Sequence, residues 1–144
     1  MAEASAELTL TDAPSTEAQA AINAGLSRYN EAKAGFSDSR PLAVVVNDPK
    51  SKAVVGGLLG RTSLGLLFID IFFLPEELRG QKLGQRIMQM AEAEAKRRGC
   101  IASLLYTINF QAPGFYEHLG YQALGKINTH PSGISRFVMT KQLA

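Results

Sequence analysis

The stretch from Leu74 to Gly84, LPEELRGQKLG, joins an apolar segment to a segment with helical spacing. The first backbone N–H groups of a helix have no partner within the helix, and the helix dipole gives them partial positive charge. A glycine-containing turn at such a terminus can therefore hold phosphate groups largely through the backbone. Arg79 adds a fixed positive charge. The chemistry that this stretch predicts is the binding of a pyrophosphate.

A second segment with chemically useful side chains runs from Asn109 to Tyr121 and reads NFQAPGFYEHLGY. The phenol of Tyr116 offers an O–H group that a general acid could use to protonate a leaving group. Phe115 and Tyr116 could equally be an aromatic pair that holds a short helix to a sheet. We favour packing for Phe115 and a chemical role for Tyr116.

Together the two segments resemble motifs A and B of the Gcn5-related N-acetyltransferase (GNAT) superfamily. Motif A, (Gln/Arg)-x-x-Gly-x-(Gly/Ala), corresponds here to RGQKLG from Arg79 to Gly84. Motif B, Asn-x-x-Ala-x-x-(apolar)-Tyr-x-x-x-Gly-(Phe/Tyr), fits the second segment at every defined position, and the resemblance extends from about Val44 to the C-terminus. Lys82 stands where the family usually has its first glycine. If that position is already helical, its φ is negative and no glycine is required.

The resemblance implies an α/β fold with a mixed, mostly antiparallel sheet of about six to seven strands flanked by helices. The sheet would be splayed between the strand ending at Leu74 and the strand starting near Ile101, with the pantetheine arm of acetyl-CoA in the gap as an added strand. A backbone amide near Phe73 would stabilise the oxyanion, and Tyr116 would protonate the departing thiolate. The implied cofactor-binding residues are Phe72, Phe73, Leu74, Arg79, Gly80, Gln81, Lys82, Leu83, Gly84, Gln85 and Asn109.

A general base is harder to assign, because the expected strand from Ile101 to Ile108 contains no carboxylate. Asp70 is the only acid in the neighbouring strand. It could face the acceptor channel or be an exposed residue of a half-solvated strand, since alternation alone does not fix the buried face. We expect Glu76 and Glu77 in solvent. Deprotonation relayed through water, without a side-chain base, is a further alternative.

The elements that must position these residues follow from the hydrophobic periodicity. A first strand could form from Ser5 to Thr11, and N-cap residues after it start a helix that ends near Ala34. The strand–helix–strand connection from Leu74 to Ile101 implies one parallel pair, whereas the hairpins are antiparallel. The other expected elements are strands at 42–46, 53–59, 64–74, 101–108, 121–127 and 134–140 and a short helix at 112–119.

A longer helix is predicted from Lys82 to Arg98, ended by Gly99. The face expected against the sheet consists of Leu83, Ile87, Met90, Ala91 and Ala95. The face expected in solvent consists of Gln85, Gln89, Glu92 and Lys96.

Length and composition predict one domain spanning residues 1–144, with a net charge of +2. The one basic cluster, Lys96–Arg98, suits a helix C-terminus, and we expect no nucleic-acid partner. Cys100 is the only cysteine, which excludes an intrachain disulfide and metal sites built on thiolate pairs. No signal peptide or bilayer-spanning run is recognisable, so we expect a cytoplasmic protein without a membrane partner.

We therefore predict an acetyl-CoA-dependent N-acetyltransferase, without a metal, that acetylates a primary amine by direct attack. The acceptor would be a small-molecule amine or a protein amine, and a homodimer is compatible with the sequence. The alternative is a CoA-binding or sensing module of the same fold without turnover, which the missing base and Lys82 keep open. A phosphate-loop nucleotide hydrolase is disfavoured, because the Gly-Lys-(Ser/Thr) ending and a metal-binding acid are absent.

Overall fold

The computed structural model describes residues 5–109 and 111–144, in two compact units that divide after Ser37 and are described separately. The first unit contains α1 (Thr16–Ala34). Ser15 Oγ accepts a hydrogen bond from the Ala18 N–H at 3.0 Å, and Gly35 ends the helix in the left-handed conformation. The strand considered for residues 5–11 is not formed, because no neighbouring strand pairs with the described backbone of residues 6–11.

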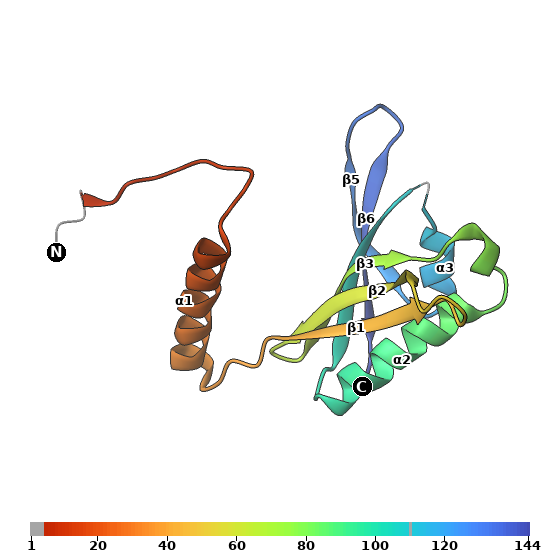
Figure 1. The fold of residues 1–144 in the computed structure, drawn as a ribbon, viewed down its shortest axis with the longest axis horizontal. Helices are drawn as coiled ribbons and strands as arrows, with labels where there is room; N and C mark the ends of the chain where they lie inside the picture. Colours follow the sequence, from red (N-terminus) through yellow and green to blue (C-terminus); the bar gives the residue numbers. More distant parts are fainter. Residues whose placement is uncertain (1–4, 110) are drawn as a thin grey trace. The chain divides into compact units, whose positions relative to one another are not determined.

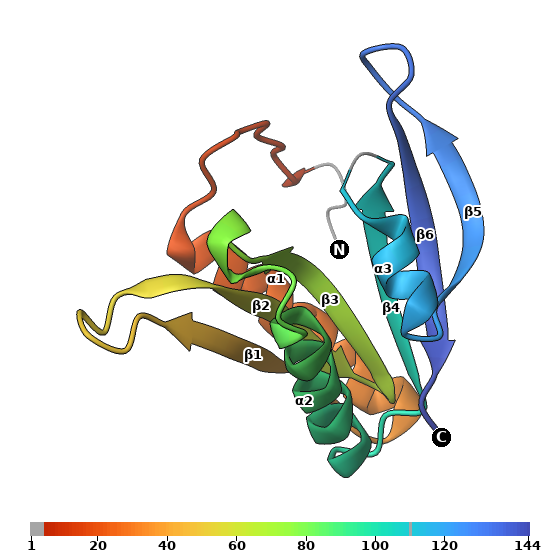
Figure 2. The same ribbon diagram turned by 90° about the vertical axis from the view of Figure 1, so that its right-hand side faces the viewer.

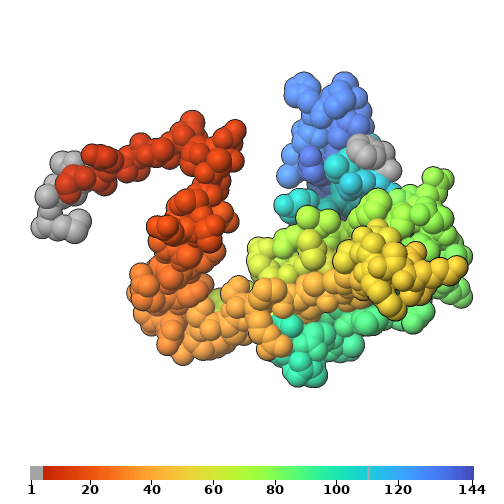
Figure 3. All heavy atoms as spheres, viewed as in Figure 1, coloured from red at the N-terminus to blue at the C-terminus, as the bar shows by residue number. Residues whose placement is uncertain are grey.

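The second unit is built on a six-stranded sheet (Figure 1). Its strand order is β1-β2-β3-β4-β6-β5, and β3 and β4 form its parallel pair among otherwise antiparallel neighbours. The mixed, mostly antiparallel sheet expected from the sequence is thereby confirmed. The β5–β6 hairpin extends beyond the other strands (Figure 3). The strands are β1 (Arg40–Asn47), β2 (Val54–Ser63), β3 (Leu66–Phe73), β4 (Ala102–Ile108), β5 (Gln122–Asn128) and β6 (Ser135–Gln142).

Two helices flank this sheet, and a short 3₁₀ turn, η2 (Glu76–Leu78), follows β3. The longer helix, α2 (Leu83–Arg97), makes the crossover from β3 to β4 and packs on β1, β2 and β3 (Figure 2). The shorter one, α3 (Pro113–His118), follows β4. At the end of α2, the Arg98 guanidinium donates to the Pro41 carbonyl at 3.0 Å and to Thr62 Oγ1 at 3.1 Å. These bonds hold the C-terminal end of α2 to the first two strands.

The parallel pair of β3 and β4 is short. Its register extends only from Leu66 opposite Ala102 to Phe68 opposite Leu104, after which the two strands diverge (Figure 2). A β-bulge lies just beyond this point. Gly60 pairs with Ile69 and Leu59 with Ile71, so Asp70 has no residue of β2 opposite it in the backbone register. A bulge bends its strand and increases the local twist. The bulge at Asp70 is therefore a local cause of the predicted splay.

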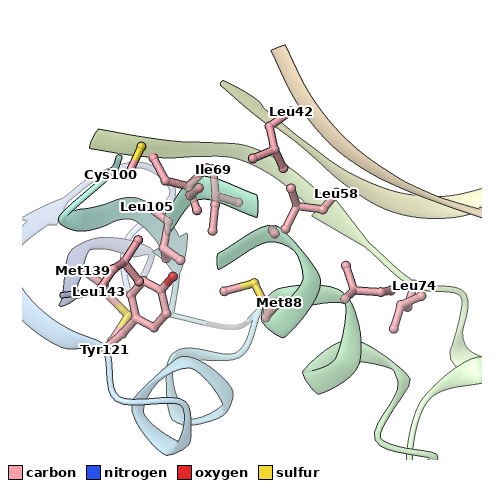
Figure 4. Packing of buried hydrophobic residues seen from close by; sticks show 14 residues of the cluster. Leu42, Leu58, Ile69, Leu74, Met88, Cys100, Leu105, Tyr121, Met139 and Leu143 are labelled. Carbon is pink, nitrogen blue, oxygen red and sulfur yellow. The ribbon is translucent and has the colours of Figure 1, made fainter. Parts of the chain in front are cut away.

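The hydrophobic core lies between α2 and the sheet and includes Leu58, Ile69 and Met88 (Figure 4). Two expectations for α2 are wrong. Met90 is 57% exposed, whereas Glu92 is buried. The reason is that Met88, which belongs to neither expected face, is fully buried. The buried face of α2 is therefore centred closer to Glu92 than to Met90.

A substitution at Gly60 tests how closely β2 and β3 approach each other at the bulge. A Cβ atom there would collide with the Phe68 carbonyl oxygen, a backbone atom that cannot move aside. We predict that Gly60→Ala lowers the free energy of unfolding by about 2 kcal/mol, measured by urea denaturation. The control is Gly125→Ala in β5, where a Cβ would meet open space. Equal stability of the two variants would contradict this packing.

Candidate active site

A cleft of about 980 Å³ lies where β3 and β4 separate. Its walls come from the second half of β3, the second half of β4, the start of α2 and the segment around α3. Gln81, Leu83 and Asn109 are not among the residues that line it. The sequence-predicted residues that do line it are Asp70, Phe72, Phe73, Leu74, Arg79, Gly80, Lys82, Gly84, Gln85 and Tyr116.

One wall of the cleft is a sheet edge. Beyond Phe68, the described residues of β3 have no β4 partner, so an extended ligand could pair with their backbone. The side chains in this part of β3 contribute to packing. Leu74 is buried, and the Phe72 ring meets the Phe115 ring edge-on with centroids 6.0 Å apart.

The turn before α2 has the features of an anion site. Gly80 has a φ of 80°, and no side chain caps the start of α2, so the first-turn N–H groups are left for an outside acceptor. Arg79 Nε donates to the Leu74 carbonyl at 2.9 Å, which ties the end of β3 to the turn. The two Nη groups of Arg79 can then bind an anion bidentately.

Lys82 has a φ of 61° and is the N-cap residue of α2. The negative φ considered from the sequence is therefore wrong, because both Gly80 and Lys82 have a positive φ before the helix begins. A left-handed conformation costs a residue with a Cβ about 1–2 kcal/mol relative to glycine. Lysine also brings a positive charge to the cleft that glycine would not. The backbone strain lowers the stability of the fold, whereas the charge favours anion binding.

Tyr116 lies among aromatic rings at the cleft. Its ring centroid is 5.1 Å from that of Phe115 and 6.0 Å from that of Tyr121, both in edge-on contact. Burial raises the pKa of Tyr116 to about 12, because a phenolate is poorly solvated there. The phenol consequently keeps its proton throughout the physiological pH range and can donate it.

Asp70, the candidate base, lines the cleft and forms an ion pair. Arg61 Nη1 lies 2.8 Å from Oδ1 and 2.9 Å from Oδ2, and the Arg61 guanidinium stacks over the Phe68 ring at 4.3 Å. The Asp70 side chain is 49% exposed. It is thus both at the cleft and in contact with solvent, and its carboxylate is shared with a cation.

Asn109 is held by the turn between β5 and β6. Its Nδ2 donates to the Gly133 carbonyl at 2.8 Å, and its Oδ1 accepts from the Ser135 N–H at 3.3 Å. The amide therefore fixes the end of β4 to the start of β6. Its contact with a cofactor arm stays a prediction.

The cleft-lining residues that sequence reasoning missed include Gln111, His118 and Arg136. Gln111 Oε1 accepts from the Ile108 N–H at 3.0 Å and so closes the end of β4. Gln111 and His118 occupy undefined positions of the second motif, and Arg136 comes from β6, outside both motifs. Only the topology brings Arg136 to the cleft, because β6 pairs with β4.

Among residues 5–109 and 111–144, no group of three or more His, Cys, Asp or Glu side chains is arranged to hold a metal ion. No helix among them is both long enough and apolar enough to cross a membrane.

Comparison with known proteins gives consistent matches. The Acetyltransferase (GNAT) family matches residues 8–121. Acetyltransferase Atu2258 of Agrobacterium fabrum is 39% identical over 127 residues, covering 88% of this chain and 91% of that protein. Blasticidin-S acetyltransferase of Streptomyces morookaense is 36% identical over 109 residues, covering 74% of this chain and 80% of that protein.

Solved structures share the fold. A crystal structure of a protein from Agrobacterium tumefaciens assigned as an acetyltransferase has a TM-score of 0.83 and 35% identity, covering 95% of this chain and 99% of that one. A crystal structure of aminoglycoside 6′-N-acetyltransferase complexed with coenzyme A has a TM-score of 0.61 and 19% identity, covering 72% of this chain and 73% of that one. The second likeness concerns the fold alone.

Replacing Lys82 separates backbone strain from charge. We predict that Lys82→Gly raises the free energy of unfolding by about 1 kcal/mol, because glycine adopts the φ of 61° without strain. Lys82→Ala removes the same charge but keeps a Cβ, so it should leave stability nearly unchanged. Urea denaturation of both variants measures the difference. Equal effects of the two substitutions would contradict the left-handed conformation.

Proposed function

Because the chain belongs to the GNAT acetyltransferase family, we propose that it transfers an acetyl group from acetyl-CoA to a primary amine by direct attack. The single observation that supports this most is the common cleft. One opening brings together the unpaired edge of β3, the helix N-terminus at Lys82 and the phenol of Tyr116. Each of the three suits a different part of a thioester reaction with CoA.

The proposed cofactor fit follows the cleft from one end to the other. The pyrophosphate would bind at the start of α2, with Arg79 and Lys82 as cations. The pantetheine amides would pair with the edge of β3 at Phe72 to Leu74, as an added strand does. The coenzyme A complex of the aminoglycoside 6′-N-acetyltransferase, which shares this fold, supports the choice of ligand.

The proposed reaction forms an N–C bond between the acceptor amine and the thioester carbonyl, and it breaks the C–S bond. Backbone N–H donors near Phe73 would stabilise the oxyanion, and each such donor can contribute about 3 kcal/mol. Tyr116 would give its proton to the departing thiolate and recover one from solvent. The pKa of about 12 keeps the phenol protonated at the pH of turnover, although burial also makes it a weaker acid than an exposed tyrosine.

Removal of the amine proton has two candidate routes. Asp70 lines the cleft and could accept it, but its carboxylate also binds Arg61. A water molecule that passes the proton to solvent is the other route, and the exposure of Asp70 is compatible with both.

The acceptor is proposed at the level of its chemistry, as a small molecule or protein that carries a primary amine. One relative is named for acetylating blasticidin S, which supports a small-molecule acceptor. We keep a cytoplasmic location, a single functional domain, a metal-free reaction and the absence of nucleic-acid and membrane partners as parts of the proposal. A homodimer is compatible with it.

Thioester turnover tests the proposal and its alternative. The purified protein is mixed with acetyl-CoA and a panel of primary amines, and free CoA thiol and N-acetyl product are measured by absorbance and mass spectrometry. The proposed function predicts equal amounts of both. Binding of acetyl-CoA without release of thiol for any amine would favour the CoA-binding module without turnover.

Arg79 provides a test of the anion site. We predict that Arg79→Ala weakens CoA binding about tenfold in calorimetry, because a charge-assisted hydrogen bond to the pyrophosphate is lost. The matched control is Arg86→Ala, which removes a charge of the same sign from an exposed position of α2 outside the cleft. Equal losses in the two variants would mean that general charge, and not this site, holds the ligand.

Tyr116→Phe keeps the ring and removes the proton. We predict a fall in kcat of about a hundredfold with little change in CoA affinity or melting temperature. Since the pKa of Tyr116 is about 12, the pH profile of wild-type kcat should show no fall caused by deprotonation of Tyr116 between pH 6 and 9. A Tyr116→Phe enzyme with wild-type kcat over that range, measured where chemistry limits the rate, would refute the acid role.

A further inference from the structure

A buried polar cluster, which we call the Glu92 cluster, lies next to the cleft without lining it. It consists of Glu92 on α2, Lys141 on β6, Ser103 on β4 and Tyr121, which follows α3. Lys141 Nζ donates to Glu92 Oε1 at 2.7 Å, and the Tyr121 phenol donates to Glu92 Oε2 at 3.0 Å. The phenol oxygen lies 2.8 Å from Ser103 Oγ, which can donate to it. One carboxylate thus connects three separate parts of the fold.

Stability alone gives a poor account of this cluster. Glu92 is 9% exposed and Tyr121 is 2% exposed, so the carboxylate has lost most of its hydration. Taking the Glu92 carboxylate out of water is costly, although the Lys141 side chain stays 27% exposed, and such ion pairs can often be replaced by apolar residues of similar size without loss of stability. A hydrogen-bonded ion pair can fix the orientation of the side chains that it binds, which an apolar contact does not do.

Tyr121 in turn contacts Tyr116 in two ways. Its backbone N–H donates to the Tyr116 carbonyl at 3.0 Å, and the two rings meet edge-on at 6.0 Å. Tyr121 therefore holds both the backbone and the ring of Tyr116. Burial and the neighbouring Glu92 carboxylate raise the pKa of Tyr121, so its phenol remains a donor to that carboxylate.

Gly120 explains how Lys141 reaches Glu92. A Cβ at Gly120 would lie 3.3 Å from Lys141 Cε, so the lysine stem passes directly over the glycine. The Lys141 ammonium then lies 5.7 Å from the centre of the Tyr121 ring. Gly120 also has a φ of 99°, which favours glycine. The adjacent residues Gly120 and Tyr121 thus serve the same cluster.

We propose that Glu92, Lys141 and Tyr121 are positioning residues that hold Tyr116 at the reacting end of the cleft. This inference rests on the proposed function, in which Tyr116 is the general acid. Because α2 begins at the anion turn and carries Glu92 further along, one rigid helix fixes both the phosphate site and the support of Tyr116.

A double-mutant cycle tests the inference. Tyr121→Phe removes the bond to Glu92 but keeps the ring against Tyr116, and we expect kcat to fall about tenfold with unchanged CoA affinity, as a small misplacement of a catalytic group does. In a Tyr116→Phe background, Tyr121→Phe should cause no further fall, because the group that it positions is already gone. Independent, multiplicative effects of the two substitutions would overturn the inference.

The cycle separates this inference from the proposed function. If Tyr116→Phe alone leaves kcat unchanged, the acid role fails and the inference falls with it. If Tyr116→Phe lowers kcat but Tyr121→Phe does not, the acid role stands and only the positioning role is overturned. The matched control is Thr140→Val, which removes another bond to β4, from Thr140 Oγ1 to the Ser103 carbonyl at 2.9 Å, without touching Tyr121. It should keep wild-type kcat.

A second variant removes the concern that Tyr121→Phe destabilises the fold. Glu92→Met with Lys141→Met replaces the ion pair by apolar side chains of similar length, and it should melt at or above the wild-type temperature. We nevertheless expect its kcat to fall about tenfold, because the Tyr121 phenol loses its carboxylate acceptor on α2 and keeps only Ser103 Oγ as a partner. Wild-type kcat in this folded double variant would overturn the inference.

A measurement without turnover completes the test. In protein labelled with 3-fluorotyrosine, Tyr116→Phe identifies the ¹⁹F resonance of Tyr116. That resonance should move or broaden in Glu92→Met with Lys141→Met and stay in place in Thr140→Val. An unchanged Tyr116 resonance in the double variant would show that the cluster does not position this residue.

Discussion

The parallel pairing of β3 with β4, which stops after Phe68, is the constraint on which the rest of the site depends. A continued ladder would satisfy the β3 backbone and close the sheet. The bulge at Asp70 turns β3 away from β4, and the cleft occupies the space that results. The same divergence sets the end of β3 beside the anion turn, to which the Arg79 bond to the Leu74 carbonyl joins it. One interruption in a sheet therefore yields the backbone edge, the cavity and the position of the phosphate site.

Because the strands separate, something else must keep the two halves of the sheet in place, and α2 does so. Its core face packs on β1 to β3, and Arg98 binds the Pro41 carbonyl and Thr62 at its C-terminal end. Glu92 on the same helix binds Lys141 of β6 and Tyr121. The helix thus connects the sheet on one side of the cleft to the sheet on the other.

The motif residues account for most of what the sequence could predict. The glycine turn and the spacing around Tyr116 are local signals, and residues from both segments line one cleft, while their roles stay predictions. The parallel pair of β3 and β4 also follows, since a strand–helix–strand crossover implies it, whereas the place of β6 between β4 and β5 was not predicted. These features depend on residues that are near one another along the chain.

The features that were missed depend on tertiary contacts. Helical spacing places Glu92 on the face opposite the core, yet its cationic partner Lys141 lies 49 positions further along the chain. The φ of Lys82 is set by the entry into α2, and a lysine gives no local sign of it. The bulge at Asp70 breaks the alternation of β3, so no count of alternating residues could have fixed its face.

We propose that the gap between β3 and β4 receives the acyl donor. A crystal structure of the protein with acetyl-CoA is the most direct test. We expect the pantetheine chain alongside Phe72 to Leu74, the pyrophosphate at the turn from Arg79 to Gly84, and the thioester sulfur within hydrogen-bonding reach of the Tyr116 hydroxyl. Acetyl-CoA bound elsewhere, or a sulfur remote from Tyr116 with the gap empty, would contradict it.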